Sequence, residues 1–191
     1  DISTPMNIEH DEVCIFIPTL NEAPTIGALV EGFRERGFSN ILVMDGNSTD
    51  KTPDIARTAG AVVRTQTGKG KGNAIIEAVE IIDTPYVLML DGDGTYSPDD
   101  AERMLDPLGC GFDHVIGDRL LNPDGEAFTR LNHLGNQILN FMFKIAHGKD
   151  LHDILSGYRA FTLHSIRQMT LKEAGFEIET EMAVEAVRHG Q

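Results

Sequence analysis

Residues 86–96, YVLMLDGDGTY, combine the pattern of a buried strand with a pair of aspartates. Five apolar or aromatic residues run directly into Asp91-Gly92-Asp93, and a short apolar run ended by turn residues is typical of a buried strand. In open α/β sheets, ligands bind beside the carboxyl ends of the strands. Two aspartates at such an edge favour a hard cation such as Mg²⁺ or Mn²⁺, which takes oxygen ligands and shares its other positions with water and substrate phosphate.

The composition is that of one globular domain with an acidic surface. The chain has 191 residues, 41% of them hydrophobic, which is enough for a core of its own. A net charge of −14, spread along the chain, argues against a nucleic-acid partner and suits work in high salt. Cys14 and Cys110 stand in unrelated contexts, so we expect Cys14 in the core and neither a disulfide nor a zinc site.

Strand patterns alternate with helix patterns four times along the first two thirds of the chain. This alternation predicts an α/β fold with a mostly parallel central sheet and helices on both faces. The expected strands are 13–18, 41–44, 61–64, 86–90 and 114–117. Beyond them we expect a long helix over 128–147, a loop that enters a short strand within 153–161, another short strand over 176–178, and a final helix over 179–189.

Charged side chains follow several of these strand ends. The residues are Glu22 after the first strand, Asp45 after the second, Lys71 after the third, and Asp91 and Asp93 after the fourth. Because parallel strands end at the same edge of a sheet, we expect these residues to converge there. Convergence favours a functional site over a polar turn that merely solvates one strand end.

The glycine–lysine run GKGKG at residues 68–72 opens the helix after the third expected strand. It fits neither the P-loop nor the dinucleotide-binding pattern. Two interpretations stay open, namely a flexible basic loop at the surface and a contact with phosphate at the helix start.

Five motifs together resemble family 2 glycosyltransferases of the GT-A fold, in matching order and spacing and over nearly the whole chain. They are IPTLNE (17–22), DGNSTD (45–50), GKGNA (70–74), DGD (91–93) and SGYRAF (156–161). Within that family the sequence is similar to polyprenyl-phosphate hexosyltransferases of the dolichyl-phosphate mannose and glucose synthase type. The phrases LSGYRAFT and ETEMAVE resemble haloarchaeal dolichyl-phosphate glucosyltransferases that start S-layer N-glycosylation.

The resemblance implies a role for each matching residue on the donor side. Pro18, Leu20 and Glu22 would line the base and ribose of a nucleotide-sugar, Asp45 would hydrogen-bond the base, and Lys71 would lie near the nucleotide. The implied metal-binding and diphosphate residues are Asp91, Gly92 and Asp93, with Thr95 where some relatives have a further ligand.

On the acceptor side, Arg119 matches the arginine that binds acceptor phosphate, and we count it with Asp91 and Asp93 as catalytic. Arg119 follows the fifth expected strand, one step beyond the strand that bears the two aspartates. The other implied acceptor residues are Arg130, Asp153, Ser156 and Arg159. A lipid phosphate needs no protein base, because its second pKa of about 6 leaves it largely dianionic at neutral pH.

The family continues beyond the last helix into a further strand and a basic, membrane-proximal stretch. We therefore expect residues 1–191 to be a single GT-A catalytic domain, truncated at its C-terminus, from an enzyme at the cytoplasmic face of the cell membrane. The chain has no Trp, so it lacks the QxxRW motif of processive polysaccharide synthases, which argues against polymerisation.

The resemblance thus implies a metal-dependent, inverting hexosyltransferase acting on dolichyl or polyprenyl phosphate for protein N-glycosylation, with Mg²⁺ or Mn²⁺ as cofactor. A UDP-sugar and glucose are favoured, whereas a GDP-sugar, and mannose transfer from GDP-mannose, stay open. Two other classes also stay open: a sugar-phosphate nucleotidyltransferase and a non-catalytic module that binds sugar nucleotides.

Overall fold

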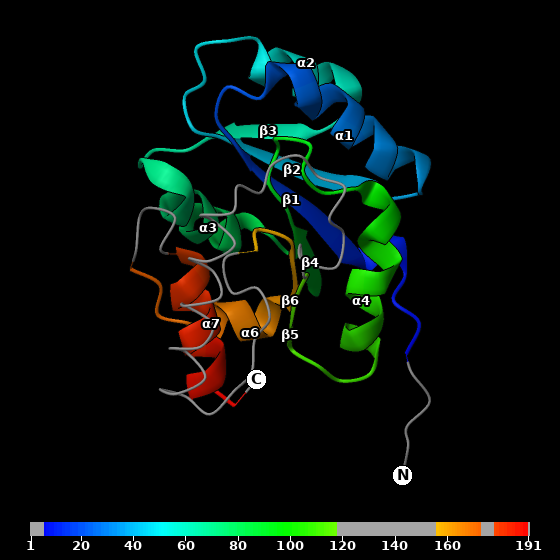
Figure 1. Ribbon diagram of the computed structural model, residues 1–191, viewed down its shortest axis with the longest axis vertical. Helices are drawn as coiled ribbons and strands as arrows, with labels where there is room; N and C mark the ends of the chain where they lie inside the picture. Colours follow the sequence, from blue (N-terminus) through cyan, green and yellow to red (C-terminus); the bar gives the residue numbers. More distant parts are fainter. Residues whose placement is uncertain (1–5, 118–155, 173–177, 191) are drawn as a thin grey trace, which may run out of the picture.

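The computed structural model describes residues 6–117, 156–172 and 178–190, which form a central sheet between two layers of helices (Figure 1). The strands are β1 (Val13–Thr19), β2 (Asn40–Asp45), β3 (Val62–Thr65), β4 (Tyr86–Met89), β5 (His114–Ile116) and β6 (Arg159–Thr162). They lie in the order β3-β2-β1-β4-β6-β5. Strands β1 to β4 pair in parallel, and β6 is antiparallel to both of its neighbours, so the expected mostly parallel α/β fold is confirmed.

The α-helices of the described residues begin and end at recognisable signals. They are α1 (Ala23–Glu35), α2 (Thr52–Ala59), α3 (Gly70–Ile81), α4 (Ala101–Gly109), α6 (Leu163–Gln168) and α7 (Ile178–Arg188). Short 3₁₀ turns, η1 (His10–Glu12) and η2 (Pro98–Asp100), precede β1 and α4. Proline stands in the first turn of α1 and α2, where no backbone donor is lost, and α2 ends at Gly60 with a φ of 110°.

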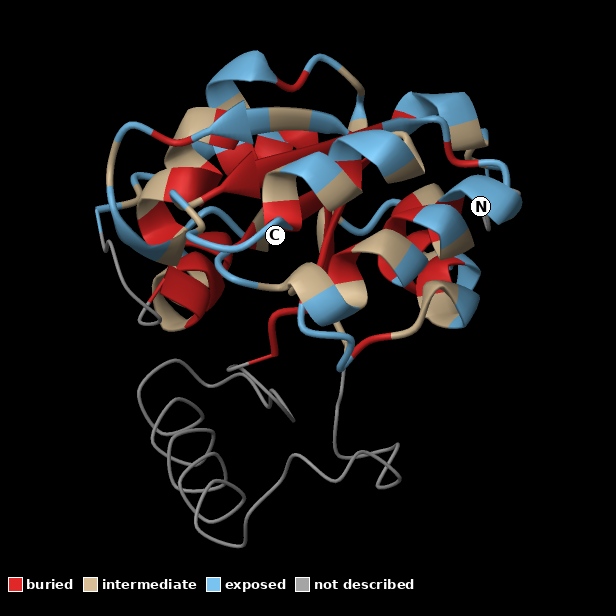
Figure 2. Ribbon diagram, turned by 90° about the horizontal axis from the view of Figure 1, so that it is seen from above, coloured by how far each residue is buried: buried red, intermediate tan, exposed pale blue. Residues whose placement is uncertain are grey.

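The strands are largely buried (Figure 2), and their alternate side chains contribute to a separate core on each face of the sheet. On β1, Ile15 and Ile17 pack with α1, α2 and α4, whereas Cys14 and Phe16 pack with α3, α6 and α7. Burial raises the pKa of the Cys14 thiol to about 12, as suits a core side chain. With both faces covered, the strands read as continuous apolar runs, which is why the sequence predicted them.

Two expectations about the sheet and helices are wrong. The fifth strand is not beside the strand that carries the aspartates, because β6 lies between β4 and β5. The strand expected over 176–178 is wrong at Ile178, which begins α7; it shares a buried helical face with Met182 and Ala186. The rest of that strand, and the helix expected over 128–147, lie outside the described residues.

Smaller differences have local causes. Helix α6 was not expected, because six residues are too few to show a helical period; Thr162 caps it by accepting from the Ser165 amide at 3.1 Å. Helix α3 begins at Gly70 rather than at residue 68, because the Glu77 carboxylate accepts from the amides of Thr67 and Gly68 and holds them outside the helix.

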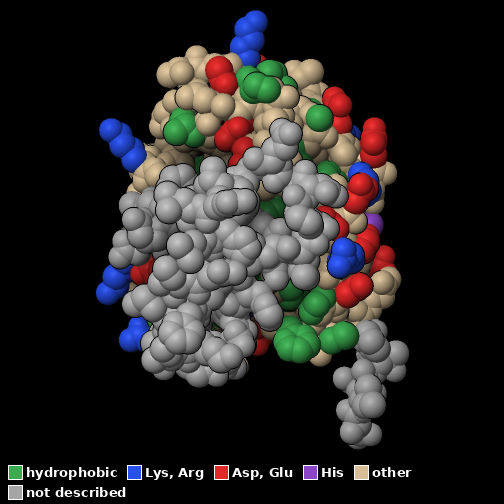
Figure 3. Space-filling model, in the orientation of Figure 1, with side chains coloured by type: hydrophobic (Ala, Val, Ile, Leu, Met, Phe, Trp, Pro, Cys, Tyr) green, Lys and Arg blue, Asp and Glu red, His purple; other side chains and the backbone are tan. Residues whose placement is uncertain are grey.

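The described surface carries mixed charge. On the face in Figure 3, acidic side chains gather along the right-hand flank, over α1 and α4, with Lys and Arg side chains among them and others at the left edge and the top. Within the described ranges, no helix combines the length and the apolar character that crossing a membrane requires.

His114 on β5 is a half-buried titratable group whose ring nitrogens are shielded from solvent. Its ring meets Phe161 of β6 edge-on, with centroids 5.8 Å apart, and neither ring nitrogen has a hydrogen-bond partner among the residues that the structure describes. Burial, and secondarily the charge of Arg159, lower the pKa of His114 from 6.5 to about 3.

Acidification should therefore cost stability through His114. Below pH 6.5 the unfolded chain takes up a proton at this ring, but the folded chain does not until the pH approaches 3. Stabilisation that is complete above pH 6.5 is lost as the pH falls, by about 1.4 kcal/mol per pH unit. We expect the free energy of unfolding, measured in urea between pH 7 and pH 4, to fall by this amount per pH unit more in wild type than in His114→Phe. A difference between the two proteins that does not change with pH would contradict the assignment.

Candidate functional site

Residues from four segments meet at the carboxyl edge of the parallel strands, as the sequence predicted. The register places Thr19 of β1 beside Asp45 of β2, and Leu90, directly after β4, donates its amide to the Phe16 carbonyl at 3.1 Å. The loops that follow β1, β2 and β4 therefore start at one level of the sheet. Pro18 is half-buried and Leu20 is 56% exposed at this edge.

Asn21 joins the loop after β1 to the loop after β2. Its φ is 55°, a left-handed conformation that Asn tolerates, and its side-chain oxygen accepts from the amides of Thr49 at 2.8 Å and Asp50 at 3.4 Å. The Asn21 amide in turn donates to Ser48 Oγ at 2.9 Å. The two loops are therefore a single hydrogen-bonded unit.

Asp45, at the end of β2, stabilises this unit through hydrogen bonds with Ser48. It is 2% exposed, and its carboxylate accepts from the Ser48 hydroxyl at 2.6 Å and the Ser48 amide at 3.0 Å. A carboxylate has about four acceptor sites, so these two bonds leave capacity for a base. The base contact expected of Asp45 stays a prediction.

Three carboxylates lie close to one another at the site. Burial raises the pKa of Glu22, and the neighbouring charges of Asp93 and Asp91 raise it further. Gly92 allows this approach, because a Cβ there would come within 2.8 Å of Thr19 Cγ2 and 3.4 Å of Glu22 Cγ. The result is a concentration of negative charge that favours a cation.

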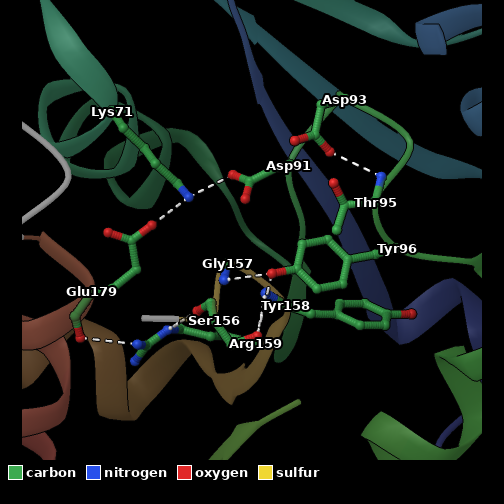
Figure 4. Close-up of polar contacts among 10 residues, drawn as sticks. All are labelled: Lys71, Asp91, Asp93, Thr95, Tyr96, Ser156, Gly157, Tyr158, Arg159 and Glu179. Atoms are coloured by element: carbon green, nitrogen blue, oxygen red, sulfur yellow. Dashed lines mark hydrogen bonds and ion pairs between the residues drawn. The ribbon is translucent and has the colours of Figure 1, made fainter. Parts of the chain in front are cut away.

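Lys71 balances part of that charge. Its Nζ lies 2.5 Å from Asp91 Oδ1 and 2.5 Å from Glu179 Oε1, between the two carboxylates (Figure 4). Burial alone would lower the pKa of Lys71, but Asp91 and Glu179 together raise it, so the ammonium stays charged. Lys71 thus contacts a residue expected to bind metal, and its place near the nucleotide stays a prediction.

The loop before β6 lies in close contact with the Asp91 side chain at Gly157. A Cβ on Gly157 would overlap Asp91 Oδ2, so any larger residue here would have to displace this carboxylate. The Gly157 amide donates to the Tyr96 hydroxyl at 3.0 Å, which ties the loop to the segment after Asp93 (Figure 4).

Two residues expected on the acceptor side, Ser156 and Arg159, are fully buried. Arg159 donates through Nε to the Ser156 carbonyl and through Nη2 to the Glu179 carbonyl, both at 2.9 Å. These contacts hold the loop to α7, and a contact of Arg159 with acceptor phosphate stays a prediction. The remaining acceptor residues, Arg119, Arg130 and Asp153, lie outside the described residues.

The donor set fits a divalent cation that shares its ligands with a substrate. Asp91 is half-buried and Asp93 is exposed, with Asp93 Oδ1 accepting from the Thr95 amide at 2.9 Å. In the ranges that the structure describes, no group of three or more His, Cys, Asp or Glu side chains is arranged to hold a metal. Two aspartates that leave positions for water and phosphate match the usual habit of Mg²⁺.

Glu179 is a site residue for which sequence analysis predicted no role. It stands 108 positions from Lys71, in a phrase that contributed only to the resemblance. A buried carboxylate in the first turn of an amphipathic helix looks like a helix-start acid, and no periodicity links it to a distant lysine.

Comparison with known proteins gives consistent matches. A model described as Glycosyl transferase family 2 matches residues 14–172. The chain is 58% identical to glycosyltransferase AglJ of Haloferax volcanii over 94% of this chain, and it spans 60% of that protein's length. It is 34% identical to dolichyl-phosphate hexose transferase of the same organism, over 82% of this chain and 70% of that protein.

A solved structure shows the same fold. Glucosyl-3-phosphoglycerate synthase from Mycobacterium tuberculosis, in complex with Mn²⁺ and uridine-diphosphate-glucose, matches with a TM-score of 0.76 and 20% identity, covering 93% of this chain and 64% of that chain. The fold is therefore of the GT-A type.

The close approach of Gly157 to Asp91 is testable. In Gly157→Ala the new methyl group must displace the Asp91 carboxylate, so we expect Mn²⁺ affinity, followed by the electron paramagnetic resonance of free Mn²⁺, to fall about 10-fold or more. Gly27→Ala in α1 is the matched control, because its Cβ meets only the end of the Ile55 side chain, at 3.0 Å. Equal Mn²⁺ binding by both variants would contradict the geometry.

Proposed function

Because the chain belongs to glycosyl transferase family 2, we propose that it is an inverting hexosyltransferase whose donor is a nucleotide-sugar and whose acceptor is dolichyl or polyprenyl phosphate. The observation that carries the proposal is the convergence of Glu22, Lys71, Asp91 and Asp93 at one edge of the sheet. Similarity to a dolichyl-phosphate hexose transferase supports the lipid phosphate acceptor.

On the donor side, the hydrogen-bonded unit of the two loops offers a rigid wall for the nucleotide. In our proposal Pro18, Leu20 and Glu22 line the base and ribose, and Asp45 bonds the base. Uridine is favoured, with glucose as the hexose, because a protein of the same fold was crystallised with uridine-diphosphate-glucose and Mn²⁺.

The diphosphate of the donor would lie at Asp91, Gly92 and Asp93, near Lys71. A divalent cation held there by the two aspartates, with Thr95 close by, supplies positive charge that stabilises the departing nucleoside diphosphate. The Lys71 ammonium, already at Asp91, adds a donor for a phosphate oxygen.

The phosphate group of the acceptor lipid is itself the nucleophile. A phosphate oxygen of the lipid attacks C1 of the sugar, the bond between C1 and the diphosphate oxygen breaks, and the nucleoside diphosphate leaves with the electron pair. Attack opposite the leaving group converts an α-linked donor into a β-linked product. No protein base is needed, because the phosphate is largely dianionic above a pKa of about 6.

Cations hold that phosphate in our proposal. Arg119 is the principal one, with Arg130, Asp153, Ser156 and Arg159 in the surrounding acceptor region. The product would be a lipid-linked hexose for protein N-glycosylation, made at the cytoplasmic face of the membrane.

One assay separates the candidates. The protein is incubated with dolichyl phosphate, Mn²⁺ and, in turn, UDP-glucose, GDP-mannose and other nucleotide-sugars, and lipid-linked hexose is measured. We expect transfer from UDP-glucose. Transfer from GDP-mannose alone would reassign the donor, and nucleotide binding without transfer by any donor would indicate a binding module.

Substitution of either aspartate should remove transfer without unfolding the protein. Asp91→Asn and Asp93→Asn keep the shape of the side chain and remove the charge, so we expect loss of lipid-linked hexose and weaker Mn²⁺-dependent binding of UDP in calorimetric titration. Wild-type transfer together with unchanged Mn²⁺-dependent binding would contradict the assignment.

Arg119→Ala should affect the acceptor and spare the donor. Loss of one charge-assisted bond of about 1.5–3 kcal/mol predicts a fall in kcat/KM for lipid phosphate of roughly 10–200-fold, with UDP affinity almost unchanged. The rate should rise near pH 6 and then stay level. Loss of UDP affinity with an unchanged KM for the lipid would place Arg119 at the donor instead.

A further inference from the structure

The position of Lys71 presents a problem for cation binding at Asp91. The Lys71 side chain is 9% exposed, and its ammonium already contacts Asp91 Oδ1. A divalent cation at Asp91 and Asp93 would need the same carboxylate and would repel the ammonium beside it. A buried ammonium that lost its only counter-charge would be strongly destabilised, so it would oppose the cation.

Glu179 removes this opposition, because it gives Lys71 a second, permanent counter-charge. Its side chain is 5% exposed, and Oε1 lies 2.5 Å from Lys71 Nζ. The other oxygen, Oε2, is buried and accepts no hydrogen bond within the described residues. Glu179 therefore accepts from Lys71 through Oε1, and Oε2 is available as a second acceptor for the same ammonium.

The backbone around Glu179 is fixed independently of Lys71. The Glu179 carbonyl accepts from Nη2 of the fully buried Arg159 at 2.9 Å, and its neighbour Ile178 lies in the core between α3, α6 and α7. Figure 4 shows Glu179 on the far side of the Lys71 ammonium from Asp91. Glu179 can thus retain Lys71 while Asp91 turns to another cation.

We propose that Glu179 is a positioning residue that holds the Lys71 ammonium and so frees Asp91 for the divalent cation. Without it, Lys71 and the cation compete for one carboxylate; with it, both positive charges have carboxylate partners. The inference rests on the proposed function, because it assumes cation binding at Asp91 and Asp93.

The test is a double-mutant cycle on Mn²⁺ affinity, measured in the presence of UDP by the electron paramagnetic resonance of free Mn²⁺. Glu179→Gln should weaken Mn²⁺ binding about 10-fold or more. In the Lys71→Met background no ammonium competes, so the same change should cost about 2-fold or less. Glu80→Gln, an exposed change nine residues beyond Lys71 on α3, is the control and should leave Mn²⁺ affinity at the wild-type value.

The outcomes separate the inference from the proposed function. An equal loss of affinity from Glu179→Gln in both backgrounds overturns the inference, because Glu179 then does not act through Lys71. Mn²⁺ binding that Asp91→Asn leaves unchanged overturns the proposed metal site itself. If Glu179→Gln does not fold, Glu179→Asp, which withdraws the charge from Lys71 by one methylene group, takes its place, and an affinity loss that Lys71→Met abolishes supports the inference.

Discussion

The pairing of β1 with β2 on one side and β4 on the other is the constraint on which the candidate site depends. In parallel strands with both faces buried, a slip of one residue would exchange the side chains between the two core layers. The registers Thr19 with Asp45 and Phe16 with Met89 are therefore strongly specified. The loops that carry the site start from these fixed points, so its geometry is a property of the whole sheet.

The excess of negative charge at this edge of the sheet favours the binding of a cation. Among the described residues, Asp91 and Glu179 pair with the Lys71 ammonium, Glu22 and Asp93 add further negative charge near Asp91, and part of this group is buried. Buried charge is costly unless it is paired, so such a cluster has its lowest free energy when further positive charge arrives. A cation that brings a diphosphate with it meets this need and gains a ligand at the same time. The acidity that the sequence shows over the whole chain thus has a local use at the site.

The sequence predicted those parts of the molecule that local patterns encode. Apolar runs located β1, β2 and β4, and the turn residues after them located Glu22, Asp45 and Asp91. The features that the sequence could not predict are those that depend on contacts between distant segments. The insertion of β6 between β4 and β5 follows from pairing across more than forty residues of separation, and the Lys71–Glu179 contact joins positions 108 residues apart. Glu179 stood in a quoted phrase, but nothing local distinguishes a buried ion-pair partner from a helix-start acid. Ile178 shows the same limit, because a short apolar run fits a strand and a helix equally well.

The hydrogen bonds of Asn21 limit how the two loops that they join can be exchanged between related domains. Each loop supplies both a donor and an acceptor to the other: the Asn21 amide donates to Ser48 Oγ, and the Asn21 side-chain oxygen accepts from the amides of Thr49 and Asp50, so each loop is complete only in the presence of the other. Grafting one loop from a relative would leave polar groups of the resident loop without partners. The two segments, residues 19–22 and 46–52, therefore form one module for recombination, and a library that varies them together would sample folded proteins far more often than one that varies either alone.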